Sequence, residues 1–317
     1  MTLKSYLSGK LYIFNTLTRA YSLPISVMSW LVPFIYALFN KGNIIYGIIS
    51  LIGIMILHLA TNLFDDIIDY YREFSDIKKG IKADFNFQKG KCICILEKKL
   101  TLKQALFVNF ILFFIAFIIC IFFLYIAGCK LLFVVVPSVI LCLLYPVLGC
   151  LGFGEIIVAV IFSPLIYSGV YYVMTMNFSL EILMLSLSTG LLCVAVLFNH
   201  SLLDYKYDTS NRKITLCSLC SSEKKALIVL LFIVLAAYLN IIFWILKGYL
   251  SIIFLLPVIT LPFALKLVKE MSIYIKQDKT PDNAQIFLEK FMLAQNLQKY
   301  FIIVLCLSII LSYWFKF

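Results

Sequence analysis

Charge is what the sequence has least of. Only 14% of its 317 residues are charged, whereas roughly a quarter of the residues in a soluble domain are. Acidic residues are the scarcest, with 16 against 27 lysines and arginines, and hydrophobic residues make up 63% of the chain. This composition excludes a soluble globular protein, a disordered chain, a fibre and a disulfide-stabilised scaffold. It leaves a polytopic membrane protein.

Two further signals are missing. No segment alternates polar and apolar residues in the manner of the strands of a membrane barrel. The first hydrophobic run begins too late for a signal peptide and lacks a small-x-small cleavage site, so we interpret it as a retained helix. In lipid each helix satisfies its own backbone hydrogen bonds. The sequence therefore predicts an all-α membrane protein.

Histidine is nearly absent, with two residues, and this bears on the ten cysteines. Most of the cysteines lie inside apolar runs, as Cys120, Cys142 and Cys193 do, where they behave as small apolar side chains. Cys217 and Cys220 form a single C-x-x-C pair with no second pair and no nearby histidine. A zinc site would lack ligands, so we expect these thiols to be incidental.

What the sequence does contain is a series of nine apolar runs, each close to the length of about 20 residues that crosses a bilayer. They cover roughly residues 23–39, 43–64, 104–127, 130–149, 152–173, 181–203, 226–246, 249–268 and 297–315. We expect residues 1–317 to form a single polytopic membrane domain, a bundle of nine transmembrane helices.

The lysines and arginines orient these runs. With the N-terminus in the cytoplasm, all of them fall on cytoplasmic segments except Lys41, Lys130, Lys247 and Lys316. Positively charged residues are retained on the cytoplasmic side of membrane proteins. Most of the net charge of +11 is therefore topological, and nucleic-acid binding is not needed to explain it. We predict a multi-pass protein of the cell membrane with a cytoplasmic N-terminus.

The long loops all fall on the cytoplasmic side under this topology. They cover about residues 65–103, 204–225 and 269–296, whereas the outer connections are only a few residues each. We therefore expect the active site at the cytoplasmic face.

The first long loop opens with an acidic motif. Asn62, Asp65, Asp66 and Asp69 are spaced i, i+3, i+4 and i+7, which places them on one face of a helix. Three carboxylates at the end of an apolar span repel one another, and a divalent cation compensates them best. Oxygen ligands favour Mg²⁺ or Mn²⁺ over zinc. A solvated acidic helix end is the plainer alternative, but it does not require the one-face spacing.

A second acidic motif lies at the matching end of the sixth span. Asp204 and Asp208 are spaced i, i+4 and share a helix face. The second and sixth spans both run toward the cytoplasm, so the two motifs end at the same depth. Basic residues accompany them, with Arg72 after the first motif and Lys206 and Lys213 in and after the second. Metal-binding carboxylates beside basic side chains are what a bound diphosphate requires.

These motifs resemble those of the UbiA superfamily of intramembrane prenyltransferases, and the resemblance covers nearly the whole chain. Several stretches are most similar to the branch that prenylates 1,4-dihydroxy-2-naphthoate in menaquinone biosynthesis. The similar stretches are residues 18–24, 62–69, 145–146, 151–155, 162–164 and 169–172, and the set Asn199, Leu203, Asp204, Asp208, Lys213, Thr215 and Leu216. Departures from the family pattern fall at Asp65, Thr209 and Arg212. The metal chemistry survives them, whereas acceptor recognition rests on parts that differ.

The resemblance implies Mg²⁺-dependent transfer of a polyprenyl group from polyprenyl diphosphate to a small aromatic acceptor. It implies that Asp66, Asp69, Asp204 and Asp208 are catalytic and bind Mg²⁺ together with Asp65. Aromatic faces would stabilise the allylic cation, and a closed site would keep water from it. The substrate-binding residues expected on this basis are Asn62, Arg72, Lys206, Lys213, Asn199, Tyr145 and Tyr171.

Two alternatives stay open. The same fold could prenylate another acceptor, such as 4-hydroxybenzoate or a glyceryl lipid. The chain could instead be an ion-coupled transporter that binds its ion through intramembrane carboxylates, although both motifs lie at one end rather than at mid-membrane. The sequence leaves open the prenyl chain length, the oligomeric state and the roles of four residues, Asp76, Glu155, His58 and His200.

Overall fold

The structure is a computed structural model that describes residues 11–78, 93–210, 214–276 and 284–315. Within these ranges the chain is helical and forms no strand. Nine helical segments of the described chain are long and apolar enough to cross a bilayer. The predicted all-α membrane fold with nine spans is therefore confirmed, and the chain is a multi-pass membrane protein.

The spans follow one another along the chain with short elements between them. They are α2 (Leu23–Phe39), α3 (Ile44–Lys78), α5 (Leu102–Ala127), α6 (Leu132–Gly149), α7 (Gly154–Val160) with η3 (Ile161–Leu165) and α8 (Ile166–Thr175), α9 (Leu180–Leu203), α11 (Glu223–Leu246), η4 (Ile252–Thr260) with α12 (Leu261–Tyr274), and α13 (Ala284–Phe315). The short elements are η1 (Ala20–Ser22), α4 (Ile93–Leu96), η2 (Cys129–Leu131) and α10 (Tyr205–Ser210).

Polar caps mark where several spans begin. Thr101 Oγ1 accepts a hydrogen bond from Gln104 N at 3.3 Å, and Gln104 Oε1 accepts one from Thr101 N at 2.9 Å, a capping box at the start of α5. Ser222 caps α11 by accepting from Lys225 N. Gly128, with a φ of 75° that favours glycine, ends α5. Local sequence thus sets the turns between spans.

The fifth span is not one regular helix. Pro164 lies inside it, and the backbone passes through the π-helical turn η3 between α7 and α8. Proline lacks the backbone N–H that a helix interior needs, and such a turn accommodates it. Ser163 in η3 donates a hydrogen bond to the carbonyl of Ser186 on α9. A Cβ on Gly190 would lie 2.6 Å from Ser163 Oγ, so glycine permits the close approach of η3 to α9.

Two helices are longer than their apolar runs. The expected loop from residue 65 is wrong, because α3 continues to Lys78, and α13 begins at Ala284 rather than near residue 297. Hydropathy marks only the part of a helix that matches lipid, whereas the backbone hydrogen bonds continue into the polar region. The first acidic motif therefore lies on a helix, as its spacing predicts.

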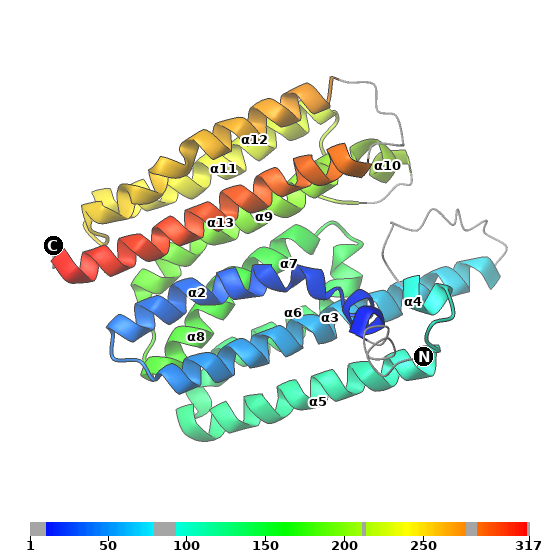
Figure 1. The fold of residues 1–317 in the computed structure, drawn as a ribbon, viewed down its shortest axis with the longest axis horizontal. Helices are drawn as coiled ribbons and strands as arrows, with labels where there is room; N and C mark the ends of the chain where they lie inside the picture. Colours follow the sequence, from blue (N-terminus) through cyan, green and yellow to red (C-terminus); the bar gives the residue numbers. More distant parts are fainter. Residues whose placement is uncertain (1–10, 79–92, 211–213, 277–283, 316–317) are drawn as a thin grey trace, which may run out of the picture.

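The helices pack around two hydrophobic cores. The larger core joins α2, α8, α9, α11 and α13, with the side chains of Tyr167, Phe198 and Phe301 fully buried in it. The smaller core lies between α3, α4 and α5 around Leu63 and Ile67. In Figure 1, α11, α12, α13 and α9 run side by side in one half of the bundle, and α2, α3 and α5 lie in the other.

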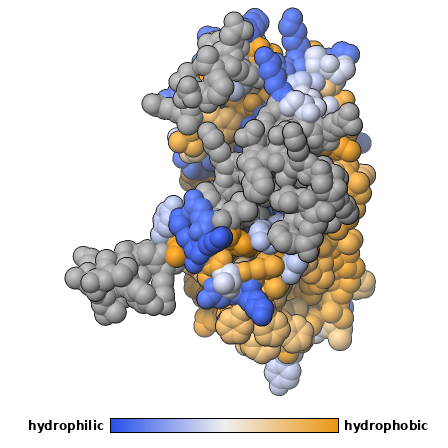
Figure 2. Space-filling view, turned by 90° about the vertical axis from the view of Figure 1, so that its right-hand side faces the viewer, coloured by the Kyte–Doolittle hydropathy of each residue, from blue (hydrophilic) through white to orange (hydrophobic). Residues whose placement is uncertain are grey.

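One end of the bundle is polar. The short helices α4 and α10 lie at this end with the C-terminal turns of α3, on the right in Figure 1. Figure 2, which faces this end, shows hydrophilic residues gathered on it and hydrophobic residues on the flank of the molecule. A polar end next to a belt of apolar surface is typical of a protein that spans a bilayer. Under the topology predicted from the lysines and arginines, this end is cytoplasmic.

Candidate active site

The first acidic motif faces into the bundle from the polar half of α3. Asp65 and Asp66 are almost completely buried, with 4% and 2% of their surfaces exposed, and the side chain of Asp69 is 21% exposed. Carboxylates this buried require compensation by a cation. The solvated helix end that the sequence left as an alternative does not fit this burial.

Arg19 supplies that compensation in the structure. Its Nη2 atom donates hydrogen bonds to Asp65 Oδ2 at 2.6 Å, to Asp66 Oδ1 at 2.5 Å and to the carbonyl of Asn62 at 3.0 Å. Burial alone would lower the pKa of Arg19, but Asp66 and Asp65 outweigh it and raise that pKa above its ordinary value. The guanidinium therefore stays charged between the two carboxylates.

Arg19 is not among the site residues predicted from the sequence, where it counts only toward the topology. Its backbone is left-handed, with φ 51° and ψ 44°, an uncommon conformation for a residue with a side chain. This conformation directs the guanidinium from the turn before η1 toward α3. The available signal was its place inside the family-like stretch 18–24, directly before the first span.

Asn62 has a different role from its aspartate neighbours on α3. Its Nδ2 atom donates to the carbonyl of Thr18 at 3.2 Å and to Ser22 Oγ at 3.0 Å. The amide thus ties α3 to the segment that carries Arg19. Asn62 therefore positions the guanidinium that pairs with Asp65 and Asp66.

Arg72 lies beside the last aspartate of the motif. Its Nη1 atom is 3.7 Å from Asp69 Oδ1, and its Nη2 atom donates to the carbonyl of Pro146 at 3.1 Å. Its guanidinium also contacts the thiol of Cys150. Arg72 therefore joins the polar end of α3 to the end of α6, with part of its side chain exposed to solvent.

The second acidic motif surrounds the end of α9. Asp204 is the C-cap of α9, and its Oδ2 atom lies 3.5 Å from His200 Nδ1. The backbone N–H of Asp208, in α10, donates to the carbonyl of Asp204 at 2.8 Å, and only 1% of the surface of Asp208 is exposed. Lys206 is exposed to solvent. Lys213 and the side chain of Asp76 lie outside the described residues.

The connection between α6 and α7 links the two motifs. Leu151 forms an isolated parallel bridge with Ile214, just after α10. Gly152 has a φ of 89°, and a Cβ there would lie 2.8 Å from a methyl carbon of Ile214, so this contact favours glycine. Glu155, at the start of α7, is buried and accepts a hydrogen bond from Ser201 Oγ on α9 at 3.3 Å. Glu155 thus packs between α7 and α9.

Cys217 lies near both Glu155 and Asp208. Burial raises the pKa of its thiol, and the nearby Cys220, Glu155 and Asp208 raise it further.

The arrangement bears directly on metal binding. Among the described residues, no three histidine, cysteine, aspartate or glutamate side chains lie close enough together to hold a metal ion as they stand. In the first motif, Arg19 pairs with oxygen atoms of both Asp65 and Asp66. The donor set, carboxylate oxygens from α3 and from α9–α10, suits a hard cation such as Mg²⁺ once those ion pairs open.

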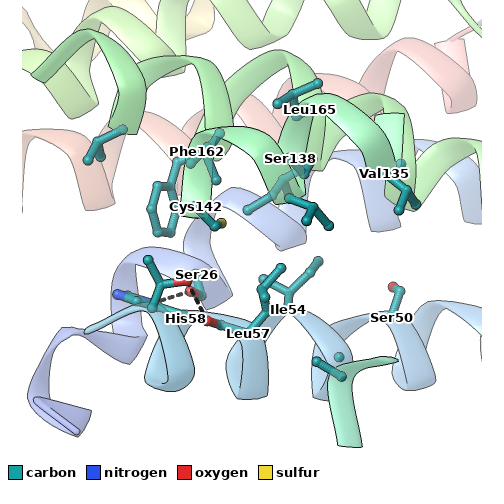
Figure 3. A pocket seen from close by; sticks show the side chains of 18 of the residues that line it. Ser26, Ser50, Ile54, Leu57, His58, Val135, Ser138, Cys142, Phe162 and Leu165 are labelled. Carbon is teal, nitrogen blue, oxygen red and sulfur yellow. Dashed lines mark hydrogen bonds between the residues drawn. The ribbon is translucent and has the colours of Figure 1, made fainter. Parts of the chain in front are cut away.

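An apolar cavity of about 600 Å³ leads away from the first motif. Arg19, Asn62 and Tyr145 line one end, and its wall extends along α3 as far as Ser50. Twelve residues of helix span roughly 18 Å. In Figure 3, Leu57 and Ile54 on α3 face Cys142, Ser138 and Val135 on α6 across this space. Such a cavity suits an extended hydrocarbon chain.

Three predicted substrate residues differ in position. Tyr145 lines the cavity at its acidic end. Tyr171 packs against Tyr36, with ring centroids 5.6 Å apart, near Glu181 at the start of α9, which is the other end of the bundle. Asn199 is fully buried and donates from Nδ2 to the carbonyl of Lys290 on α13 at 3.1 Å. The structure brings Tyr145 toward the aspartates but does not bring Tyr171 there, and Asn199 faces α13.

Comparison with solved structures places this fold among known ones. The chain is similar to a structure from work on digeranylgeranylglyceryl phosphate synthase in membranes, with a TM-score of 0.65, 14% identity and coverage of 95% of this chain and 99% of that one. It is also similar to an apo UbiA homologue from Aeropyrum pernix K1, with a TM-score of 0.57, 15% identity and coverage of 91% and 98%.

A third similar structure is a UbiA homologue from Archaeoglobus fulgidus bound to GPP and Mg²⁺, with a TM-score of 0.54, 11% identity and coverage of 92% and 99%. No curated protein sequence matches the chain. The model of the UbiA prenyltransferase family matches residues 23–295, which confirms the expectation of a prenyltransferase. The chain belongs to the UbiA prenyltransferase family.

Proposed function

We propose that this protein transfers a polyprenyl group from polyprenyl diphosphate to an aromatic acceptor, 1,4-dihydroxy-2-naphthoate, in menaquinone biosynthesis. The observation that supports it best is that the buried Asp65 and Asp66 pair with Arg19, which lines one end of a long apolar cavity. The polar head of the substrate would bind at the carboxylates and its hydrocarbon chain would occupy the cavity. An ion-coupled transporter has no need of such a cavity.

Five aspartates would hold Mg²⁺ at this site. The carboxylates of Asp66 and Asp69 on α3 and those of Asp204 and Asp208 would be the main ligands, with Asp65 beside them. A UbiA homologue with this fold is bound to GPP and Mg²⁺, which supports this assignment. Mg²⁺ held by these residues would offset the negative charge that develops on the diphosphate as the C–O bond breaks.

The remaining residues of the site would bind and orient the substrates. Arg72 and Lys206, together with Lys213, would contact the diphosphate oxygens. Tyr145 would face the allylic carbon, where an aromatic face stabilises positive charge by roughly 0.5–2 kcal/mol. The apolar wall of the cavity would keep water from the cation. Tyr171 packs against Tyr36 and Asn199 bonds the carbonyl of Lys290, so we do not place either of them against the substrates.

The choice of acceptor rests on the similar sequence stretches. Residues 62–69, apart from the departure at Asp65, and the stretch around Tyr145 are most similar to the branch that prenylates 1,4-dihydroxy-2-naphthoate. A glyceryl lipid is the second candidate, favoured by the likeness to the structure from work on digeranylgeranylglyceryl phosphate synthase. We place the reaction at the cytoplasmic face of the cell membrane, on the basis of the lysines and arginines.

A direct assay tests the proposal. The purified protein in detergent is incubated with a long-chain polyprenyl diphosphate, Mg²⁺ and 1,4-dihydroxy-2-naphthoate, and prenylated product is measured by mass spectrometry. Asp66→Asn and Asp208→Asn should each lower the rate at least a hundredfold, because each removes a buried carboxylate. Glu97→Gln, which changes an exposed carboxylate on the same polar end, is the matched control.

The outcomes separate the levels of the proposal. Product that requires Mg²⁺ and both aspartates supports the enzyme and its acceptor together. Mg²⁺-dependent transfer to a glyceryl lipid alone would keep the prenyltransferase and replace the acceptor. No diphosphate release with any acceptor would overturn the proposed function.

A further inference from the structure

His58 is held in an unusual setting on the wall of the cavity. It lies on α3 one helical turn before Asn62. Its Nδ1 atom is 2.6 Å from Ser26 Oγ, and its Nε2 atom is 3.1 Å from Ser22 Oγ. Both serines belong to the start of α2 and η1. Figure 3 shows His58 beside Ser26 on the side of the cavity opposite Phe162 and Cys142.

The surroundings of this imidazole are otherwise apolar. The ring of Phe162 packs edge-on against it, with centroids 5.2 Å apart. The other ionisable side chains among the described residues that line the cavity are those of Arg19, Tyr21 and Tyr145 and three cysteine thiols. Of these groups, only an imidazole ordinarily gains and loses a proton near neutral pH.

The two serines suit an imidazole that changes its protonation state. A hydroxyl can donate or accept a hydrogen bond, whereas a carbonyl can only accept and an amide N–H can only donate. Ser22 and Ser26 can therefore satisfy both ring nitrogens of His58 when it is neutral and when both nitrogens carry protons. A histidine needed only to join α2 to α3 would be served by one fixed tautomer.

Ser22 connects this imidazole to the active site. Its Oγ atom accepts a hydrogen bond from Asn62 Nδ2 at 3.0 Å, and its single hydroxyl proton can be donated either to the carbonyl of Arg19 at 2.8 Å or to His58 Nε2 at 3.1 Å. Asn62 and Arg19 are the residues that meet Asp65 and Asp66. Ser22 thus places a hydroxyl between the end of the cavity that Arg19 and Asn62 line and the Nε2 atom of His58.

We propose that His58 accepts the hydroxyl proton of the acceptor during prenyl transfer, with Ser22 as the relay. The acceptor hydroxyl gives its proton to Ser22 Oγ as the proton of Ser22 passes to His58 Nε2. The C–O bond of the prenyl diphosphate breaks with its electron pair leaving on the diphosphate, and the electron pair released from the acceptor hydroxyl then forms the new bond to the first prenyl carbon. With a glyceryl lipid the bond forms at the hydroxyl oxygen, and the proton on His58 returns to solvent after product release. With the naphthoate the bond forms at a ring carbon, which then loses its proton or its carboxyl group (as CO₂), so that the ring regains aromaticity and the oxygen takes its proton back.

This assignment rests on the proposed function, but it requires only an acceptor with a hydroxyl group. A naphthoate and a glyceryl lipid both meet that condition. Ser26, which bonds the far side of the ring, is a positioning residue. Removing the base should uncouple the reaction, because diphosphate loss continues while capture of the prenyl group by the acceptor fails.

The test measures how much prenylated product forms per diphosphate released. His58→Gln keeps a polar side chain in place but cannot accept a proton, and it should lower this ratio about a hundredfold. Ser22→Ala, which leaves the imidazole in place, should lower the ratio in the same direction. The control is Tyr238→Phe, which removes a buried interhelical hydrogen bond to Thr260 outside the cavity and should leave the ratio unchanged.

A rescue experiment separates proton transfer from packing. His58→Ala is assayed with imidazoles of similar size and different basicity. Product formation that rises with the basicity of the added imidazole supports the proposal, whereas rescue independent of basicity overturns it. If the wild-type protein transfers the prenyl group to an acceptor and neither His58→Gln nor Ser22→Ala changes the ratio, the role of His58 is overturned and the proposed function stands. If the wild-type protein transfers the prenyl group to no acceptor, the proposed function is overturned as well.

Discussion

Nη2 of Arg19 lies 2.6 Å from Oδ2 of Asp65, across 46 positions of sequence, and the same nitrogen bonds Asp66. One guanidinium therefore pairs with two carboxylates that we assign to Mg²⁺. The positive charge of the arginine and that of the metal compensate the same oxygens, so the two compete for them. This competition predicts that removing the arginine changes how strongly Mg²⁺ stabilises the protein.

Arg19→Gln should destabilise the metal-free protein. The change removes the guanidinium that pairs with the buried Asp65 and Asp66, and a buried ion pair that loses one partner costs roughly 3–5 kcal/mol. Mg²⁺ should restore much of this stability, because it can take over the carboxylates. Thermal unfolding in detergent, with and without Mg²⁺, measures both effects. An equal shift of Tm by Mg²⁺ in the variant and the wild type would contradict the assignment.

The spans and the one-face spacing of the first motif follow from local sequence. Hydropathy over about 20 residues reports contact with lipid, and the i, i+3, i+4 spacing reports a helix face. The residue that pairs with this helix face cannot be predicted from local sequence. The contact between Arg19 and Asp65 joins two segments that are brought together only by the packing of α2 against α3. Local patterns carry no such information.

The position of Tyr171, in contrast, could have been predicted from the sequence. Its place among the substrate residues came from resemblance, yet the register of its own span argues against it. Glu155 begins that span at the polar end, and sixteen residues of helix carry Tyr171 roughly 24 Å away. The structure places Tyr171 beside Tyr36 and Glu181 at the other end. The rise per residue alone therefore separates Tyr171 from the acidic motifs.

Arg72→Gln should weaken the binding of the prenyl diphosphate. Arg72 lies 3.7 Å from Asp69 and is partly exposed at the mouth of the site, where its guanidinium can turn toward phosphate oxygens. Loss of a charge-assisted hydrogen bond should raise KM roughly ten- to a hundredfold. Steady-state kinetics with varied prenyl diphosphate measure it. Lys98→Gln removes a charge from an exposed position after α4 and should leave KM unchanged.

Ser138→Phe should shorten the prenyl chain that the enzyme accepts. Ser138 lies on α6 and faces the cavity across from α3, and its hydroxyl bonds only the carbonyl of Val134 among the described residues. An added ring fills part of the 600 Å³ space, so long-chain diphosphates should lose activity at least tenfold relative to dimethylallyl diphosphate. Leu132→Phe, on an exposed position of the same helix, is the control. Unchanged chain-length preference would remove the cavity from the substrate path.

Cys129 and Cys150 offer a direct test of the orientation. Both are exposed and free, and they lie at opposite ends of α6. Under the topology predicted from the lysines and arginines, Cys129 faces outward and Cys150 faces the cytoplasm. In intact cells that express single-cysteine variants, a membrane-impermeant maleimide should label Cys129 and spare Cys150. Permeabilised cells should show labelling of both, which controls for access to each thiol. The reverse pattern in intact cells would invert the topology and move the acidic motifs, with the prenyl diphosphate they bind, to the outer face.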